Sequence, residues 1–184
     1  MKLKTLKDLY RDELRDVYDA ENQIVKALPK MVTAASSPEL EKALQEHLDK
    51  TKSHLRRLDQ VFKSMGEKPK RKTCEGLKGL LEEGKELMEE DAEPAVMDAG
   101  LIAGAQRVEH YEMAAYGSLR TWAEQLGEED AVPLLEQTLE EEKEADQILS
   151  EIAMTVNPEA AEGESEPETQ TTRPRKRSHR ANGS

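Results

Sequence analysis

The chain has 184 residues, of which 36% are hydrophobic, 36% are charged and only 3% are aromatic. Since strands favour aromatic and β-branched side chains, this composition argues against an all-β fold. The formal net charge of −12 argues against a nucleic-acid-binding domain, which normally carries a basic face. Alanine, leucine, glutamate and lysine dominate, and because these residues favour helices we expect an all-α protein.

Two features of the sequence bear on location. Cys74 is the single cysteine and cannot form an internal disulfide, which fits a reducing compartment. The N-terminal residues alternate charge with leucine, so they do not read as a secretory signal, and no stretch is apolar for long enough to span a membrane. We therefore expect a cytoplasmic protein without a membrane partner.

The first two predicted helices form a hairpin. Apolar residues recur every three to five positions from about residue 4 to 34, which predicts one long helix. Pro29 lies inside this pattern and should kink the helix or thin its last turn. Ser37 is a natural N-cap and Pro38 a natural first-turn residue, so a second helix should begin there and end before Gly66.

The second half of the chain predicts another hairpin, preceded by a crossover. Residues 67–73 form a basic linker, and a shorter helix is expected at about 75–90. Pro94 should open a third long helix that ends near Gly127. The apolar spacing then predicts a fourth long helix at about 129–155.

The composition changes after the fourth helix. Residues 157–184 contain almost no large apolar side chain and therefore cannot offset the entropy of ordering. We place a helical bundle at 1–156 and a disordered tail at 157–184. The basic end of this tail is the one part for which nucleic acid or an acidic partner stays open, although a solvated tail is the preferred interpretation.

The two hairpins look like copies of each other. A constant offset of 91 aligns Glu21 with Glu112 and Leu28 with Leu119, with no gap. Two antiparallel hairpins joined by one long crossover have the connectivity of ferritin-like folds. The predicted fold is therefore an all-α, ferritin-like four-helix bundle with an extra short crossover helix.

One layer of this bundle should be polar. Glu21, Glu112 and Glu142 each lie on an apolar stripe, and His54 lies on the stripe of the second long helix. Counting at ~1.5 Å per residue from each turn places all four side chains at similar depth. A core-facing glutamate is costly unless it is paired or bound to a metal.

Carboxylate di-metal bundles use one glutamate on each of two helices and Glu-x-x-His on each of the other two. Here the second helix has His54 but carries Thr51 in place of the glutamate, and the fourth has Glu142 but carries Ala145 in place of the histidine. We expect neighbouring carboxylates to complete the site and treat His47 as a weaker candidate. The predicted metal ligands are Glu21, His54, Glu109, Glu112, Glu142 and Asp146.

Other polar side chains have more ordinary interpretations. Tyr18 and Tyr116 lie near the predicted glutamates and could bond to them, although core packing is the commoner role. Cys74 should lie in the linker beside Lys72, where a basic neighbour can lower the pKa of a thiol. In the acidic run 140–142, only Glu142 is expected to leave the solvent.

Three motifs carry a family resemblance: Tyr-Asp-Ala-Glu at 18–21, Glu-His-Tyr-Glu at 109–112 and Glu-Glu-Lys-x-Ala-Asp at 141–146. With the runs around them they resemble the YciE/YciF family of bacterial ferritin-like proteins over residues 3–155. The resemblance implies a five-helix domain related to rubrerythrins, usually dimeric, with a di-metal centre and induction under stress.

The sequence leaves two functions open. The first is a redox protein with two iron or manganese ions that react with peroxide or oxygen or oxidise ferrous iron. The second is a non-catalytic, dimeric stress or interaction protein with a degenerate metal site, which the incomplete Glu-x-x-His pairs favour. A ferritin-type storage cage is the least favoured hypothesis. Neither the metal nor the existence of enzymatic turnover follows from the residues.

Overall fold

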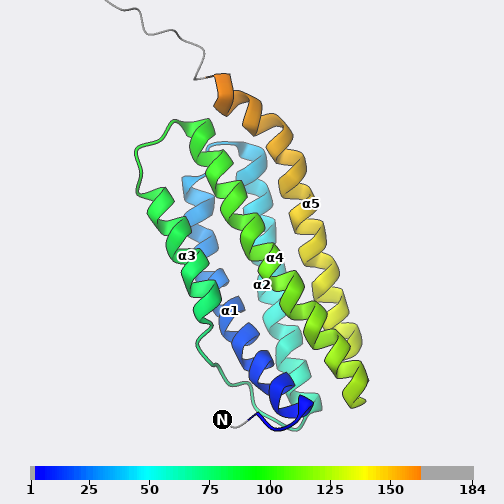
Figure 1. The fold of residues 1–184 in the computed structure, drawn as a ribbon. Helices are drawn as coiled ribbons and strands as arrows, with labels where there is room; N and C mark the ends of the chain where they lie inside the picture. The colour runs from blue at the N-terminus through cyan, green and yellow to red at the C-terminus, as the bar shows by residue number, and fades with distance from the viewer. Residues whose placement is uncertain (1–2, 163–184) are drawn as a thin grey trace, which may run out of the picture.

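The computed structural model describes residues 3–162, in which every regular element is a helix. The long helices lie side by side, with a shorter helix against their outer face (Figure 1). The helices are α1 (Leu6–Ala34), α2 (Pro38–Ser64), α3 (Glu75–Met88), α4 (Pro94–Leu126) and α5 (Val132–Glu162). The predicted all-α class and the order of the elements are confirmed. Within residues 3–162, no helix has the length and apolar character needed to cross a membrane.

Local sequence signals set the helix ends. Thr5 and Asp8 form a capping box at the start of α1, because each side chain accepts a hydrogen bond from the other's backbone N–H. The Ser37 hydroxyl accepts from Leu40 N at the start of α2. Gly127 ends α4 with φ of 69°, a left-handed conformation that glycine adopts without steric cost.

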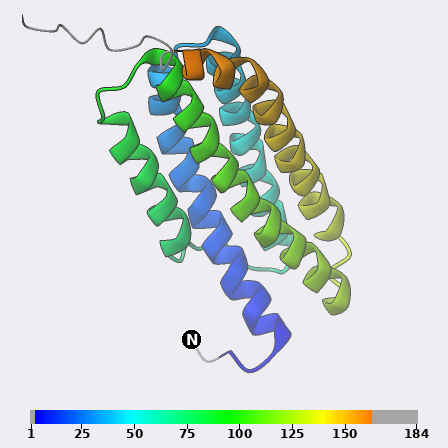
Figure 2. The same ribbon diagram turned by 45° about the horizontal axis from the view of Figure 1, so that its top comes forward.

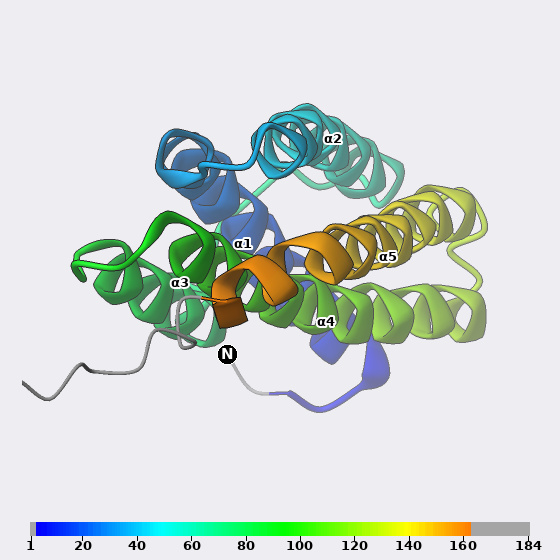
Figure 3. The same cartoon turned by 90° about the horizontal axis from the view of Figure 1, so that it is seen from above.

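The topology follows from two antiparallel hairpins. Helix α1 packs on α2, α4 packs on α5, and the two hairpins meet through α1 with α4 and α2 with α5. The chain leaves the first hairpin at the end of α2, returns along the bundle as α3, and then enters α4 (Figures 1 and 2). The view along the bundle shows α3 outside the four-helix square, beside α1 and α4 (Figure 3).

The core is divided into two apolar clusters by a polar layer. On α1, Val17 belongs to one cluster and Ile24 to the other, and the buried Glu21 lies between them. The other long helices repeat this arrangement. The flanking pairs are Leu48 and Leu58 on α2, Val108 and Ala115 on α4, and Leu149 and Leu135 on α5. The predicted layer therefore exists, with apolar packing above and below it.

The fourth long helix ends later than the sequence predicts. Helix α5 continues to Glu162 and includes Pro158, so residues 157–162 belong to the helix and not to the tail. Val156 is buried and anchors this turn. Pro158 removes one backbone donor, but the unpaired carbonyl would belong to Met154, which is 78% exposed and can be hydrated. The remainder of the predicted tail lies outside the described residues.

Candidate metal centre

Two groups of possible ligands meet in the polar layer, and Glu142 belongs to both. Within each group the ligand atoms all lie within 4.8 Å of one another. The first group contains His47, Glu109, Glu112 and Glu142, and the second contains Glu21, His54 and Glu142. Together they draw side chains from all four long helices.

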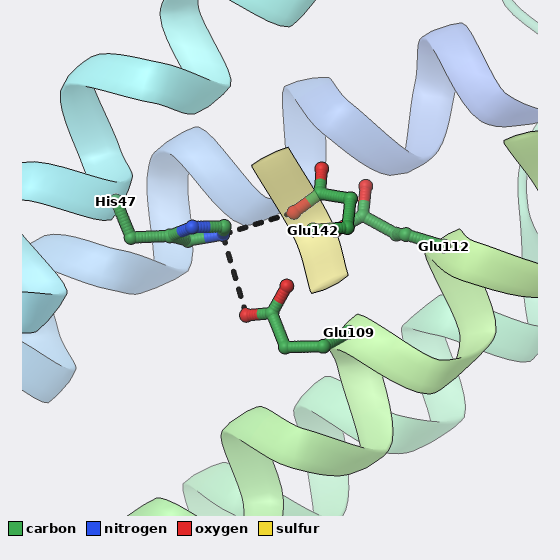
Figure 4. A group of neighbouring side chains, drawn as sticks. All are labelled: His47, Glu109, Glu112 and Glu142. Carbon is green, nitrogen blue, oxygen red and sulfur yellow. Dashed lines mark ion pairs between the residues drawn. The ribbon is translucent and has the colours of Figure 1, made fainter. Parts of the chain in front are cut away.

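The carboxylate of Glu142 has one oxygen directed at each histidine. Its Oε1 lies 2.9 Å from His54 Nδ1, and its Oε2 lies 4.0 Å from His47 Nε2. On the first side, His47 Nε2 also lies 3.4 Å from Glu109 Oε1 (Figure 4). On the second side, His54 Nδ1 lies 3.4 Å from Glu21 Oε1. A carboxylate placed in this way can bridge two adjacent cations.

These side chains are almost completely removed from solvent. Glu21, His54 and Glu142 are fully buried, and His47, the most exposed member of either group, retains 7% of its surface. A charged carboxylate pays a large desolvation penalty in such a place unless a cation or hydrogen bonds compensate it. The layer is therefore costly for the metal-free protein.

Burial sets the protonation of the glutamates on α4. Burial raises the pKa of Glu109 well above its usual range, and the nearby Glu142 raises it further. Burial also raises the pKa of Glu112, to which Glu21 and Glu142 add like-charge repulsion. The metal-free protein therefore favours the neutral form of both α4 carboxyls.

The two histidines differ in charge. Burial alone would lower the pKa of His54, but Glu21 and Glu142 outweigh it and raise the pKa to about 10. Burial of Glu142 acts to raise its pKa, but contact with the charged His54 outweighs this and lowers it. Burial lowers the pKa of His47, so its ring is neutral, and neutral imidazole is the form that binds metals.

Several buried atoms of the layer have no hydrogen-bond partner within residues 3–162. They include both carboxylate oxygens of Glu112 and both ring nitrogens of His47. Buried polar groups are otherwise almost always paired, so unpaired donors and acceptors that converge on one point indicate a ligand. Oxygen and imidazole donors suit iron or manganese, so the residues present fit such a group.

Glu141 supports the centre from outside, a role that the sequence analysis missed. It had been expected to lie in a solvated acidic run, but its Oε2 lies 3.0 Å from His54 Nε2. Arg57 donates to both Glu141 oxygens, at 2.8 and 2.6 Å. Burial of Glu141 acts to raise its pKa, but Arg57 and other hydrogen bonds outweigh this and hold the pKa at about 2. An ionised carboxylate on the far nitrogen fixes the orientation of a ligating imidazole.

Only one of the two tyrosines singled out in the sequence reaches the layer. The Tyr116 hydroxyl is fully buried and donates to Glu21 Oε1, which fixes that carboxylate from α4. The Tyr18 hydroxyl points away and donates to Asp59 Oδ1 at 3.0 Å. The two tyrosines therefore have different roles, although each lies within one turn of a ligand-bearing position.

The structure brings five of the six predicted ligands together: Glu21, His54, Glu109, Glu112 and Glu142. Asp146 is not brought into either group. It accepts from Gln106 Nε2 at 3.1 Å and lies 3.4 Å from His110 Nε2 near the surface. His47, two turns before His54 on α2, occupies the first group instead. The Thr51 hydroxyl between them is bonded to the His47 carbonyl at 2.8 Å.

Cys74 lies elsewhere and is not an exposed linker thiol. It is the residue before α3, it is fully buried, and its Sγ lies 3.0 Å from Tyr111 Oη. Burial raises the pKa of the Cys74 thiol, and the nearby Asp16 raises it further, which is the reverse of the lowering that its basic sequence neighbours suggested. The thiol is therefore held in its neutral, unreactive form.

Comparison with known families places this chain. The family described as "Domain of unknown function (DUF892)" matches residues 5–162. The chain belongs to this family. Protein YciF of Escherichia coli (strain K12) is 45% identical over 155 residues, which cover 84% of this chain and 93% of YciF. The resemblance found in the sequence motifs is therefore confirmed.

Solved structures agree with this assignment. The crystal structure of the Escherichia coli stress protein YciF has a TM-score of 0.82 at 44% identity, covering 85% of this chain and 99% of that one. YcfI from Rhodopseudomonas palustris has a TM-score of 0.80 at 46% identity, covering 81% and 95%. A two-domain protein from Anabaena variabilis with DJ-1-like and ferritin-like domains has a TM-score of 0.56 at 16% identity, covering 96% and 42%, and bears on the fold alone. The fold is a ferritin-like helical bundle.

Proposed function

We propose that this DUF892 protein binds two iron or manganese ions in the polar layer. The observation that carries the proposal is the placement of Glu142, whose two oxygens face two different histidines. Glu142 would bridge the ions. His47, Glu109 and Glu112 would hold one ion, and Glu21 and His54 would hold the other. In the usual di-metal pattern, a histidine follows the glutamate by three residues on each of two helices. Helix α5 has Ala145 at that position, and His47 from α2 would supply the missing imidazole.

The chemistry would be redox chemistry on a small oxidant. Iron or manganese bound between carboxylates supplies electrons to peroxide or dioxygen, or catalyses the oxidation of ferrous iron. The protein's own residues hold the ligands in place and exclude bulk water. Tyr116 positions Glu21, Glu141 positions His54, and the apolar clusters pack above and below the layer. Such positioning sets the affinity and the electronic properties of a metal centre.

The family relationship suggests the setting in which this chemistry operates. The relative from Escherichia coli is described as a stress protein. We propose a protective role under stress for this chain as well, as a cytoplasmic homodimer. Gel filtration of the full chain should give the mass of a dimer, and a cage-sized particle or a monomer would contradict this part of the proposal.

Metal analysis tests the centre directly. Protein purified without chelator, or loaded anaerobically with ferrous or manganous ions, should contain about two ions per chain by the di-metal pattern. His47→Ala should lose the ion of the first group and retain much of the second. His110→Ala is a matched control, since His110 has a side chain that is 67% exposed.

A bundle that works without metal is the competing hypothesis. It predicts that the full chain stays empty after loading, with His47→Ala and His110→Ala indistinguishable from it. The metal content of Glu142→Gln is a second test, because this variant removes the charge of the side chain common to both groups while keeping its volume. Unchanged metal content in Glu142→Gln would show that the centre is assigned to the wrong residues.

A further inference from the structure

A row of apolar cavities leads from the crossover helix toward the polar layer. The outer cavity lies among α1, α3 and α4 and has a volume of about 40 Å³. Its walls consist only of apolar side chains and glycines, among them Leu81, Leu87 and Gly104. A cavity with such walls stays dry and accepts small apolar molecules, and about 10–15 Å³ of this volume is enough for one molecule the size of water.

A second cavity continues this row inward. Its volume is about 20 Å³, and Ile24 and Ala105 lie in its wall. The two cavities share four wall residues, namely Ala27, Met31, Leu81 and Val108. His47 and Glu109, both of the first ligand group, also lie in the wall of the second cavity. The two adjacent cavities therefore lie between α3 and the proposed metal centre.

The opposite approach to the same pair has different chemistry. A cavity of about 30 Å³ between α2 and α5 also reaches His47 and Glu109, but Glu46 and Lys50 lie in its wall. Charged side chains there suit ions and strongly hydrated molecules, such as metal ions or peroxide. The apolar row has no such group before it reaches the ligands, so it suits a neutral, poorly hydrated molecule.

Gly104 on α4 leaves open space in the wall of the outer cavity, as does Gly84 on α3. A glycine inside a helix costs up to about 1 kcal/mol relative to alanine. Close packing does not require it here, since a Cβ built on Gly104 meets nothing within 4 Å. Gly100, one turn earlier, differs, because a Cβ there would lie 2.7 Å from Leu87. Space beside Gly104 is therefore left unfilled although the chain has room for a larger residue.

We propose that this row of apolar cavities is the route by which dioxygen reaches the His47 and Glu109 side of the centre. The proposal rests on the proposed function and names its oxidant. The cavities select for small molecules, because each has room for only one or a few molecules the size of water. They select for low polarity, because the walls before the ligands are apolar. The charged mouth between α2 and α5 is left for metal loading and for polar molecules.

The route can be measured in metal-free protein with dioxygen itself as the probe. Under oxygen pressure, paramagnetic relaxation of methyl groups should rise more at Met31 and Leu81 than at Leu134 and Leu139, which are likewise partly buried but pack against the other cluster. It should also rise more at the buried Val108 than at the buried Leu14 and Leu119. Gly104→Leu should fill the outer cavity and abolish the additional paramagnetic relaxation at Val108. Gly79→Leu is the matched control, because Gly79 is exposed on α3 with nothing within 4 Å.

Two results would overturn the route. One is equal paramagnetic relaxation at the methyl groups of the cavity walls and at the control methyl groups. The other is additional relaxation at Val108 that stays unchanged in Gly104→Leu. In iron-loaded protein, Gly104→Leu should also slow oxidation by dioxygen while leaving metal content and oxidation by peroxide unchanged. A chain that takes up no iron would overturn the proposed function, and the relaxation data would still decide whether dioxygen follows the cavities.

Discussion

Glu112 shows at the scale of one residue how the centre opposes the stability of the metal-free fold. It is 2% exposed, both its oxygens lack a hydrogen-bond partner within residues 3–162, and burial raises its pKa. When the pKa of a carboxyl is higher in the folded state than in the unfolded state, its contribution to the free energy of unfolding is fully present only at a pH below the unfolded pKa. This contribution is lost as the pH rises toward the folded value.

Glu112→Gln should therefore stabilise the metal-free protein at neutral pH. We expect an increase in the free energy of unfolding, because the variant cannot ionise and so removes the charge that burial and the neighbouring glutamates disfavour. The gain should shrink as the pH falls toward 4.5, the ordinary pKa of the group. Urea unfolding of chelated protein at several pH values measures it, with the exposed Glu140→Gln as control. A destabilised Glu112→Gln would contradict this account.

Glu141 offers a second residue-scale prediction, because it touches the centre only through His54. Glu141→Gln keeps the size of the side chain but removes the charge that orients the imidazole. Loss of such a partner typically weakens metal binding about 10–100-fold. Competition with a chelator of known affinity measures the change. Glu140→Gln is the matched control on the preceding residue, and an equal affinity in both variants would refute the positioning role.

Residue-level prediction from sequence succeeded where one helix decides the environment. Glu21, Glu112 and Glu142 interrupt apolar stripes, and that pattern places them inside without knowledge of any other helix. Glu141 failed because its burial depends on Arg57 and His54, which approach from α2. His47 was treated as a weaker candidate because its spacing from His54 does not match Glu-x-x-His, but the structure places it in the first group. The seven-residue interval between the two histidines returns to nearly the same face of a helix and was the available signal.

At the scale of elements, Asp98 fastens one hairpin to the other. It is buried on α4, and its two carboxylate oxygens accept from the backbone N–H groups of Ser36 and Ser37, both at 2.8 Å. These are the donors of the turn between α1 and α2. Subtracting the repeat offset of 91 from Asp98 gives Lys7, and adding it to Ser37 gives Glu128. Lys7 and Glu128 form an ion pair at 3.0 Å, so the contact between hairpins recurs in both halves.

Asp98→Ala should be costly because it removes both hydrogen bonds that the buried carboxylate accepts from the turn. Hydrogen bonds to a charged group contribute about 1.5–3 kcal/mol each, so we expect a loss of about 3 kcal/mol. The midpoint and slope of urea unfolding give this value. Lys7→Ala should cost less than about 1 kcal/mol, as expected for an exposed pair. Similar losses in the two variants would mean that Asp98 does not hold the turn.

The helix boundaries show which part of an element can be predicted. Ser37, Pro38 and Gly127 are local signals, and each marks an end that the structure confirms. The end of α5 was placed too early because Pro158 usually stops a helix. Val156 packs in the core cluster and holds the last turns of α5 against the bundle, and this burial depends on residues of the other helices. A signal confined to a few residues cannot report that packing.

For the whole molecule, the repeat, the crossover length and the apolar stripes together predicted the ferritin-like arrangement. Each of these patterns extends over many residues, so an error of a few residues at one helix end does not change the predicted arrangement. The crossover helix was expected to run back along the bundle, but its contacts with α1 and α4 were not predicted. Those contacts, which bury Cys74 beside Tyr111, depend on how two helices meet and not on the pattern of either one.

The centre joins all four long helices, so metal binding should stabilise the whole bundle. The ligands of each group are far apart in sequence and converge only in the folded chain. A ligand that binds only the folded state raises the free energy of unfolding, by about 2.7 kcal/mol at a free concentration 100 times its Kd. Addition of ferrous or manganous ions to chelated protein under anaerobic conditions should therefore raise the Tm, and chelator should reverse the shift.

Glu142→Gln and Glu140→Gln make this prediction specific to the centre. Glu142→Gln should lose most of the metal-induced shift in Tm, because Glu142 serves both groups. Glu140→Gln, which changes an exposed residue, should show the full shift. If the ions raised the Tm of both variants equally, the stabilisation would come from the acidic surface of a chain with net charge −12. Cations gathered there are screened by salt, so a shift that survives high ionic strength belongs to the buried layer.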